Sequence, residues 1–180
     1  MIELDGQSVR VIATQFGPFA VVTDDETVVE ATWLRAEHEV DRLKENRDGS
    51  RLSARLADRA IEEVQAYFRG ELTAFTVPVR AHGTRFQKAV WQALCAIPYG
   101  ETATYGEIAE RIGRPAAVRA VGQANRANPV AVIVPCHRVV GKGSVLRGYA
   151  GAAVDIQEGL LALEQGLLLL LPEMFDLIRE

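Results

Sequence analysis

A cysteine lies directly beside a histidine in the segment Val-Pro-Cys-His-Arg-Val-Val, which spans residues 134–140. Residues 130–134 are apolar throughout and mostly β-branched, so they predict a short buried strand. Pro135 fixes its own φ and favours an extended conformation of the residue before it, so we expect the thiol of Cys136 at the end of a rigid element. A neighbouring base such as His137 generates the nucleophilic thiolate near neutral pH. The alternative is a structural cysteine, since free cysteines often pack in cores.

The charge of the chain is distributed unevenly. Of its 180 residues, 48% are hydrophobic and 24% charged, which is ordinary for a globular protein of one large or two small domains. The formal net charge is −4, yet residues 80–151 contain 10 basic and 3 acidic side chains, a balance of +7, between two acidic flanks. A local basic face attracts phosphate whatever the overall charge, although chance clustering on the surface is the alternative.

Composition also argues against several classes of protein. No apolar N-terminal segment follows a basic stretch, so we expect no signal peptide. The leucine run at residues 167–171 is too short to span a bilayer, so we expect no membrane partner. Cys95 and Cys136 form no CxxC pair, which argues against a disulfide scaffold and a cysteine-based zinc site. A reactive thiol suits the reducing cytoplasm, where we expect the protein.

Residues 1–80 predict a small N-terminal α/β domain without visible chemistry. Runs of β-forming residues are separated by turn residues such as Gly17 and Asp24, which is typical of a β-meander. A helix is expected over residues 53–69, because apolar side chains recur every four residues and Gly70 follows as a stop signal. His38 lies in a charged stretch and is expected to be solvated. The expected strands cover residues 8–14, 18–23 and 27–34, with 75–79 as a further candidate.

A linker at residues 80–84 leads to a mostly helical C-terminal domain over residues 85–166. The first helix is expected from Arg85 to Ile97, with one apolar face. Trp91 is expected to pack in the core rather than to stack on a base. Cys95 lies beside the apolar face and is expected to be a packing residue rather than a second nucleophile. The tail, residues 167–180, has no predicted role.

Two short helices joined by a tight turn are predicted over residues 105–112 and 115–127. Pro115 is a favourable first helical residue, and Asn128-Pro129 is a stop signal, so the pair forms a helix-turn-helix. The second helix consists mostly of small residues and can approach its partner closely. That partner is either a neighbouring helix or DNA. In the DNA interpretation the contacting residues are Arg119, Gln123 and Arg126, with the small Ala120 and Gly122 between them.

The motifs occur in a fixed order that resembles one protein family. Thr-Tyr-Gly-Glu-Ile-Ala at 104–109, Arg-Ala-Val-Gly at 119–122, Asn-Pro at 128–129 and Gly-Tyr-Ala-Gly at 148–151 surround Pro-Cys-His-Arg. With these spacings the chain resembles the O6-alkylguanine-DNA alkyltransferases, most densely over residues 86–164. The resemblance implies a monomer that transfers an alkyl group once, from O6-alkylguanine in double-stranded DNA to Cys136, without a cofactor. Several relatives hold zinc in the N-terminal domain through cysteines, which this domain lacks, so we expect no metal.

The resemblance also implies how the DNA is handled. The second helix of the helix-turn-helix enters the minor groove, where small residues are needed, and the damaged nucleotide is flipped into a pocket. Arg119 would fill the vacated space in the base stack, although a phosphate contact is the alternative. Backbone groups of Val139, Tyr149 and Ala150 would read the base edge.

The remaining roles concern the reaction itself. Cys136 would attack the alkyl carbon, with His137 as the base through a water molecule and Tyr105 as the acid that protonates the leaving guanine. Asn128 would bridge the helix-turn-helix to the cysteine segment; an Asx turn is the modest structural alternative. A carboxylate must orient the histidine, and Glu164 matches the family glutamate. Its competitors are Asp155 and Glu158.

Some residues depart from the family pattern, and three other functions compete with alkyl transfer. The departures are one apparent extra residue before the Glu164 helix, the altered segment 152–158, Ala150 and Arg147, and they bear on the pocket rather than on Cys136. A non-catalytic protein that binds alkylated bases would lack the cysteine. A methyl-sensing transcription regulator needs a cysteine-rich region and a further DNA-binding module. A cysteine hydrolase needs an oxyanion hole, which no motif marks.

Overall fold

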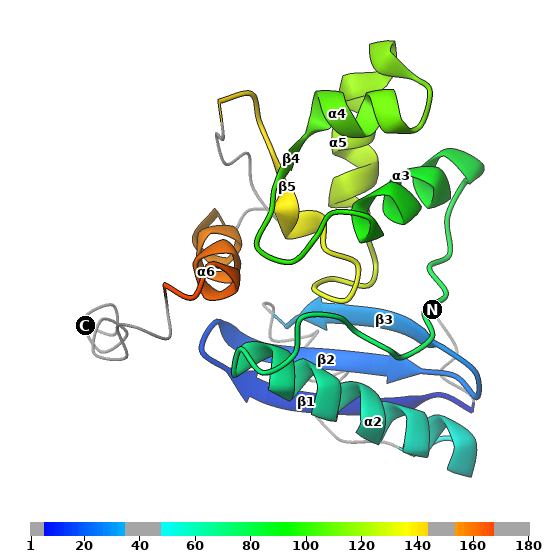
Figure 1. Cartoon of the computed structure of the whole chain (residues 1–180). Coiled ribbons are helices and arrows are strands. Elements are labelled where there is room, and N and C mark those ends of the chain that lie inside the picture. The colour runs from blue at the N-terminus through cyan, green and yellow to red at the C-terminus, as the bar shows by residue number, and fades with distance from the viewer. Residues whose placement is uncertain (1–5, 35–47, 144–153, 168–180) are drawn as a thin grey trace.

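The computed structural model describes residues 6–34, 48–143 and 154–167 (Figure 1). Within these residues an antiparallel sheet and a helix form the N-terminal part, and the rest is mostly helical, so the predicted fold class is confirmed. In Figure 1 the sheet and α2 lie at the bottom, α3 to α5 gather at the top, and α6 lies at the left. His38 falls outside the described residues.

The N-terminal sheet has the strand order β1-β2-β3, with β1 (Ser8–Thr14), β2 (Gly17–Thr23) and β3 (Val28–Trp33). Gly17 has a φ of 110°, which lets the β1–β2 hairpin turn tightly. Helix α2 (Arg51–Phe68) packs against the sheet through its apolar face. It begins earlier than predicted, because the Ser50 side chain caps it by accepting hydrogen bonds from the Leu52 and Ser53 amides.

The candidate strand at residues 75–79 is wrong. Only Val79 forms an isolated bridge, to Val28, where the Val28 amide donates to the Pro78 carbonyl and the Arg80 amide donates to the Val28 carbonyl. Pro78 has no amide hydrogen to donate, so a regular ladder cannot continue through it.

The C-terminal part packs its helices around a short parallel sheet. Thr84 begins α3, and Thr104 begins α4, each with a capping box. The predicted helix at 115–127 is divided into a 3-10 turn and α5. Sequence reasoning missed the sheet, because strands this short carry no periodicity. The elements are α3 (Arg85–Cys95), β4 (Ala103–Thr104), α4 (Tyr105–Arg111), η1 (Pro115–Ala117), α5 (Val118–Arg126), η2 (Cys136–Arg138), β5 (Val139–Val140) and α6 (Val154–Glu164).

The apolar run at residues 130–134 is buried as predicted, but the predicted strand is wrong. The run folds into a tight turn, in which the Val134 amide donates to the Val130 carbonyl at 2.9 Å and Val132 has a φ of 70°. The turn attaches to the N-terminal sheet, because the Ala131 amide donates to the Ala31 carbonyl at 2.7 Å and the Ala31 amide donates to the Pro129 carbonyl at 2.9 Å. The buried backbone groups of this run therefore find their hydrogen-bond partners within the turn and in β3 rather than in a regular strand ladder.

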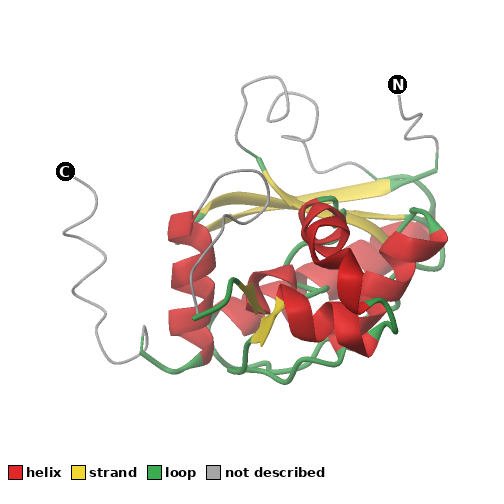
Figure 2. Ribbon diagram, turned by 90° about the horizontal axis from the view of Figure 1, so that it is seen from above, coloured by secondary structure: helices red, strands yellow, loops and turns green. Residues whose placement is uncertain are grey.

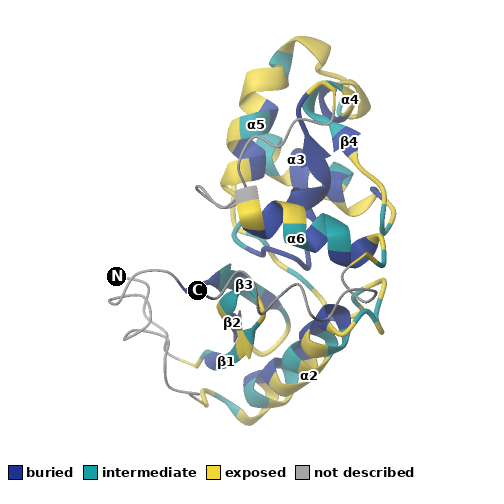
Figure 3. Cartoon of the chain, turned by 90° about the vertical axis from the view of Figure 1, so that its left-hand side faces the viewer, coloured by how far each residue is buried: buried dark blue, intermediate teal, exposed yellow. Residues whose placement is uncertain are grey.

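One hydrophobic core joins the two parts of the chain. The same cluster contains Phe19 and Trp33 of the sheet, Trp91 of α3 and Leu160 of α6. Figure 2 shows α6 standing at one end of the sheet, and Figure 3 shows buried residues of α3 and β4 in the middle of the C-terminal part, with exposed residues on its outside. None of the helices in the described parts is both long and apolar enough to cross a membrane.

Candidate active site

The thiol of Cys136 is buried where the helix-turn-helix meets the cysteine turn. Asn128, just after α5, donates from its Nδ2 to the Sγ of Cys136 at 2.9 Å and to the Val134 carbonyl at 2.9 Å. Its Oδ1 accepts from the Val130 amide at 3.1 Å, which closes an Asx turn. Asn128 thus has the geometry of both arrangements considered from the sequence, a bridge to the cysteine and a local turn.

His137 faces the carboxylate of Glu164 in a fully buried pair. The two side chains have 0% exposure, and His137 Nε2 lies 2.7 Å from Glu164 Oε1. Asp155 and Glu158, the competing carboxylates on α6, are exposed. Of the three candidates, Glu164 is therefore the one whose carboxylate meets the imidazole. This is the geometry of a base held by an acid, as in other nucleophile–base–carboxylate sites.

Three further groups hold the Glu164 carboxylate. Arg138 forms a fork, with Nη2 2.9 Å from Oε1 and Nε 2.9 Å from Oε2. The Gly100 amide donates to Oε2 at 3.0 Å, and the Tyr67 hydroxyl donates to Oε1 at 2.7 Å. Gly100 has a φ of 78°, so the loop that delivers this amide favours glycine.

The network shifts the pKa values of both members of the buried pair. Burial raises the pKa of Glu164, but hydrogen bonds and charge from His137, with hydrogen bonds from Arg138 and Tyr67, lower it to about 2. Burial lowers the pKa of His137, an effect that Glu164 opposes and Arg138 reinforces. The carboxylate is thus charged at neutral pH and the imidazole is suited to act as a base.

Two buried amides fix the backbone on either side of the thiol. Asn125 of α5 donates to the Cys136 carbonyl at 3.2 Å. Gln157 of α6 donates to the His137 carbonyl at 3.0 Å and to the Val139 carbonyl at 2.9 Å. Sequence reasoning missed both amides, as well as Tyr67 and Arg138. The available signals were a polar residue on the inner face of a helix for Asn125, and the arginine of the Pro-Cys-His-Arg motif itself.

The residues predicted to contact DNA lie on α5. Its outer face exposes Arg119, Ala120, Gln123 and Arg126, while the inner face is buried. Gly122 is half-buried, and a side chain there would contact the Tyr105 ring at 3.9 Å. The outer face thus carries two arginines and a glutamine beside a small residue, and the packing against Tyr105 leaves room for a small side chain at position 122.

Tyr105 begins α4 directly after the short parallel sheet. It follows Thr104, which pairs with Val140 at the end of the cysteine segment. The Val139 amide donates to the Cys136 carbonyl, and its own carbonyl accepts from Gln157. If Val139 reads a base edge, its amide and carbonyl must therefore bind the base in addition to these partners within the protein. Tyr149 and Ala150, the other predicted base-reading residues, lie outside the described residues.

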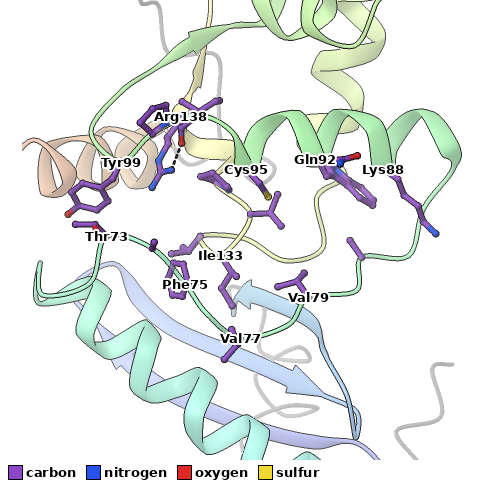
Figure 4. Close-up of a pocket in the computed structure, with 18 residues that line it drawn as sticks. Thr73, Phe75, Val77, Val79, Lys88, Gln92, Cys95, Tyr99, Ile133 and Arg138 are labelled. Carbon is purple, nitrogen blue, oxygen red and sulfur yellow. Dashed lines mark hydrogen bonds between the residues drawn. The ribbon is translucent and has the colours of Figure 1, made fainter.

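A cavity of about 530 Å³ lies behind the cysteine turn, between the segment at 73–81 and α3 (Figure 4). Pro135 and Arg138 line it, but Cys136 does not. Cys95 also lines it and is exposed, so it does not have the packed position predicted for it. Although the residue as a whole is exposed, partial burial raises the pKa of its thiol, with Arg138 acting against this. Trp91 is buried as predicted, and its Nε1 donates to the Ala124 carbonyl at 2.8 Å.

No metal ligand set emerges from the part of the chain that the structure describes, where no three histidine, cysteine or acidic side chains cluster. The arrangement instead combines a buried thiol, an amide donor aimed at its sulfur, and an adjacent imidazole held by a charged carboxylate. Such a site can perform nucleophilic displacement by the thiol.

Comparisons with known proteins agree along most of the chain. Residues 9–81 match the family described as "6-O-methylguanine DNA methyltransferase, ribonuclease-like domain", and residues 85–166 match its "DNA binding domain". A methylated-DNA–protein-cysteine methyltransferase of Methanosarcina acetivorans is 45% identical over 157 residues, covering 86% of this chain and 96% of the relative.

Solved structures agree as well. The O6-methylguanine methyltransferase of Mycobacterium tuberculosis superimposes with a TM-score of 0.76 at 41% identity, covering 89% of this chain and 93% of the other. The OGT of the same organism in complex with DNA also gives a TM-score of 0.76, at 41% identity, covering 88% and 93% of the two chains.

Proposed function

The chain belongs to the family of 6-O-methylguanine DNA methyltransferases, and from this premise we propose how its residues perform the reaction. Its activity is repair of alkylated DNA by direct reversal, in which a cysteine of the protein itself accepts the alkyl group. We assign this role to Cys136. The observation that carries the assignment is the contact of its Sγ with Asn128 at 2.9 Å, beside the buried His137–Glu164 pair.

The substrate is O6-alkylguanine in double-stranded DNA. The outer face of α5 approaches the minor groove, where Ala120 permits close contact and Arg126 neutralises a phosphate. Because the alkyl carbon is out of reach inside a duplex, the nucleotide is rotated into the protein and Arg119 fills the gap in the stack. The exposure of these side chains along one face of α5 supports this docking. One protein monomer acts on one lesion.

The transfer is an in-line displacement at the alkyl carbon. A water molecule carries the thiol proton to His137, and Glu164 stabilises the imidazolium that results. The Cys136 sulfur forms a bond to the carbon as the bond from that carbon to O6 breaks, and the electron pair of that bond stays with the guanine. Tyr105 donates its phenolic proton to the departing base and recovers one from solvent. The thioether is stable, so each molecule reacts once, without a cofactor.

Two alternatives lose support at this site. A protein that only recognises alkylated bases needs no nucleophile, whereas Cys136 has a base and an amide donor around it. A methyl-sensing regulator needs additional cysteines, and the chain has only Cys95 beside Cys136. We place the reaction in the cytoplasm, because a reduced thiol is required.

Single-turnover kinetics with an oligonucleotide containing one O6-methylguanine test this proposal. We expect one equivalent of guanine to be restored per protein molecule, with no second turnover when the substrate is in excess. Continued turnover, or tight binding without restored guanine, would contradict the proposal.

A further inference from the structure

A tyrosine of the N-terminal domain reaches into the catalytic network. Tyr67 lies on the inner face of α2 and has 0% exposure. Its hydroxyl donates to Glu164 Oε1 at 2.7 Å and lies 3.3 Å from His137 Nε2. The same carboxylate oxygen therefore receives both the imidazole and the phenol.

The N-terminal domain is tightly packed against the helix that carries Glu164. A Cβ atom added to Gly159 of α6 would overlap the ring of Phe16, in the hairpin between β1 and β2. The absence of a side chain at Gly159 thus allows the hairpin to seat directly on α6. Because α2 and this hairpin belong to one domain, the Tyr67 hydroxyl keeps a fixed position relative to Glu164.

The location of the Glu164 carboxylate does not depend on Tyr67. Arg138 holds both oxygens through its fork, and the Gly100 amide holds Oε2. These donors remain when the phenol is removed. What the phenol changes is how much of the negative charge on Oε1 is available to the imidazole.

We propose that Tyr67 is a positioning residue of the transfer reaction that acts through Glu164, by sharing Oε1 with His137 and so limiting how strongly the carboxylate binds the imidazole. This role rests on the proposed function, since it concerns the base that activates Cys136. It makes the N-terminal domain a determinant of thiol reactivity.

The direction of the effect follows from the groups that face His137. Glu164 from α6 stabilises the imidazolium, and Arg138 from η2 disfavours it. Tyr67 from α2 competes for Glu164, while Tyr99 packs against Tyr67 and lies near Arg138, 5.7 Å from its guanidinium. Without the Tyr67 hydroxyl, Glu164 binds the imidazolium more strongly. The thiolate beside a better stabilised imidazolium then forms at lower pH.

The pH dependence of alkylation by iodoacetamide tests this directly. The measurements use a Cys95→Ser background, because Cys95 is exposed and would also react. We expect Tyr67→Phe to move the midpoint for Cys136 to lower pH by about one unit, the order expected for loss of one hydrogen bond to a charged group. Glu164→Gln should move it to higher pH.

Thr23→Val is the matched control. It removes a buried hydroxyl of the same domain, which donates to the Ser53 carbonyl at 2.8 Å, away from the site. It should lower the melting temperature without moving the midpoint. An unchanged or raised midpoint in Tyr67→Phe would overturn the proposal, even if that variant also melts earlier.

Methyl transfer from a methylated oligonucleotide is measured in parallel on the parent protein. A parent that takes no methyl group refutes the proposed function, whereas the iodoacetamide midpoints still report on Tyr67. A parent that transfers normally while Tyr67→Phe keeps the parent midpoint refutes only the role of Tyr67.

Discussion

Glu164→Gln perturbs the network at its centre, and its effect on stability follows from the pKa of the carboxylate. The Glu164 side chain is fully buried, and its pKa is lowered from 4.5 to about 2. At about 1.36 kcal/mol for each pKa unit, the ionised carboxylate stabilises the fold by about 3 kcal/mol. Because the folded-state pKa lies below the unfolded one, this stabilisation is complete above about pH 4.5 and is lost as the pH falls toward 2.

The substitution also leaves the buried guanidinium of Arg138 without its carboxylate. Removing one partner of a buried ion pair typically costs about 3–5 kcal/mol, so we expect a loss in that range at pH 6. Urea unfolding of the parent and Glu164→Gln, measured from pH 6 down to pH 2.5, gives the difference directly. That difference should shrink by about 2.5 kcal/mol by pH 2.5, because the carboxyl group of the unfolded parent takes up a proton there while the folded one stays mostly ionised.

Glu158→Gln on the same helix is the control, because Glu158 is exposed and should change stability by no more than about 0.5 kcal/mol. Glu164→Gln should also slow methyl transfer at neutral pH, with recovery at alkaline pH as the thiolate forms without help from the base. A stability difference that stays constant with pH would refute the charged state assigned to Glu164. A transfer defect in Glu158→Gln instead would refute the assignment of the orienting carboxylate.

Four further substitutions test other parts of the account. Arg119→Ala should slow repair of duplex substrate but not of free O6-methylguanine, and equal slowing of both substrates would exclude the flipping role. Arg126→Ala should weaken DNA binding and reduce the salt dependence of that binding. Asn128→Ala should raise the apparent thiol pKa, measured by iodoacetamide labelling against pH, and an unchanged pKa would contradict the contact. It should also cost about 1–3 kcal/mol in urea unfolding, because the buried Val130 amide loses its acceptor. Gly159→Ala should lower stability by about 1–3 kcal/mol because the new methyl group displaces the Phe16 ring, and an unchanged melting temperature would contradict the close packing.

The sequence predicted the elements whose signals are local. The three N-terminal strands and α2 follow from alternating residues, turn residues and caps within a few positions of one another. The run at 130–134 was misread because a buried strand and a buried turn need the same apolar residues. What separates them is the hydrogen bond of Ala131 to Ala31, one hundred residues away along the chain, which no local pattern records.

The candidate site divides in the same way. Cys136, His137 and Glu164 could be found because motif and register mark them, and the structure brings His137 and Glu164 together. Tyr67 is 97 residues from Glu164 and reads in the sequence as one more apolar position of α2. Only the packing of the two domains shows that its hydroxyl belongs to the network. The division of the chain near residues 80–85 and the base-reading roles of Tyr149 and Ala150 stay predictions.

The location of the transferred group tests the central claim most directly. The protein is incubated with an oligonucleotide containing O6-methylguanine, digested, and its peptides are mapped by mass spectrometry, alongside a Cys136→Ser variant. We expect one methyl group on Cys136 in the parent, none on Cys95, and no methylated peptide in the variant, which should still bind DNA. A methyl group on Cys95, or continued demethylation by Cys136→Ser, would contradict the account.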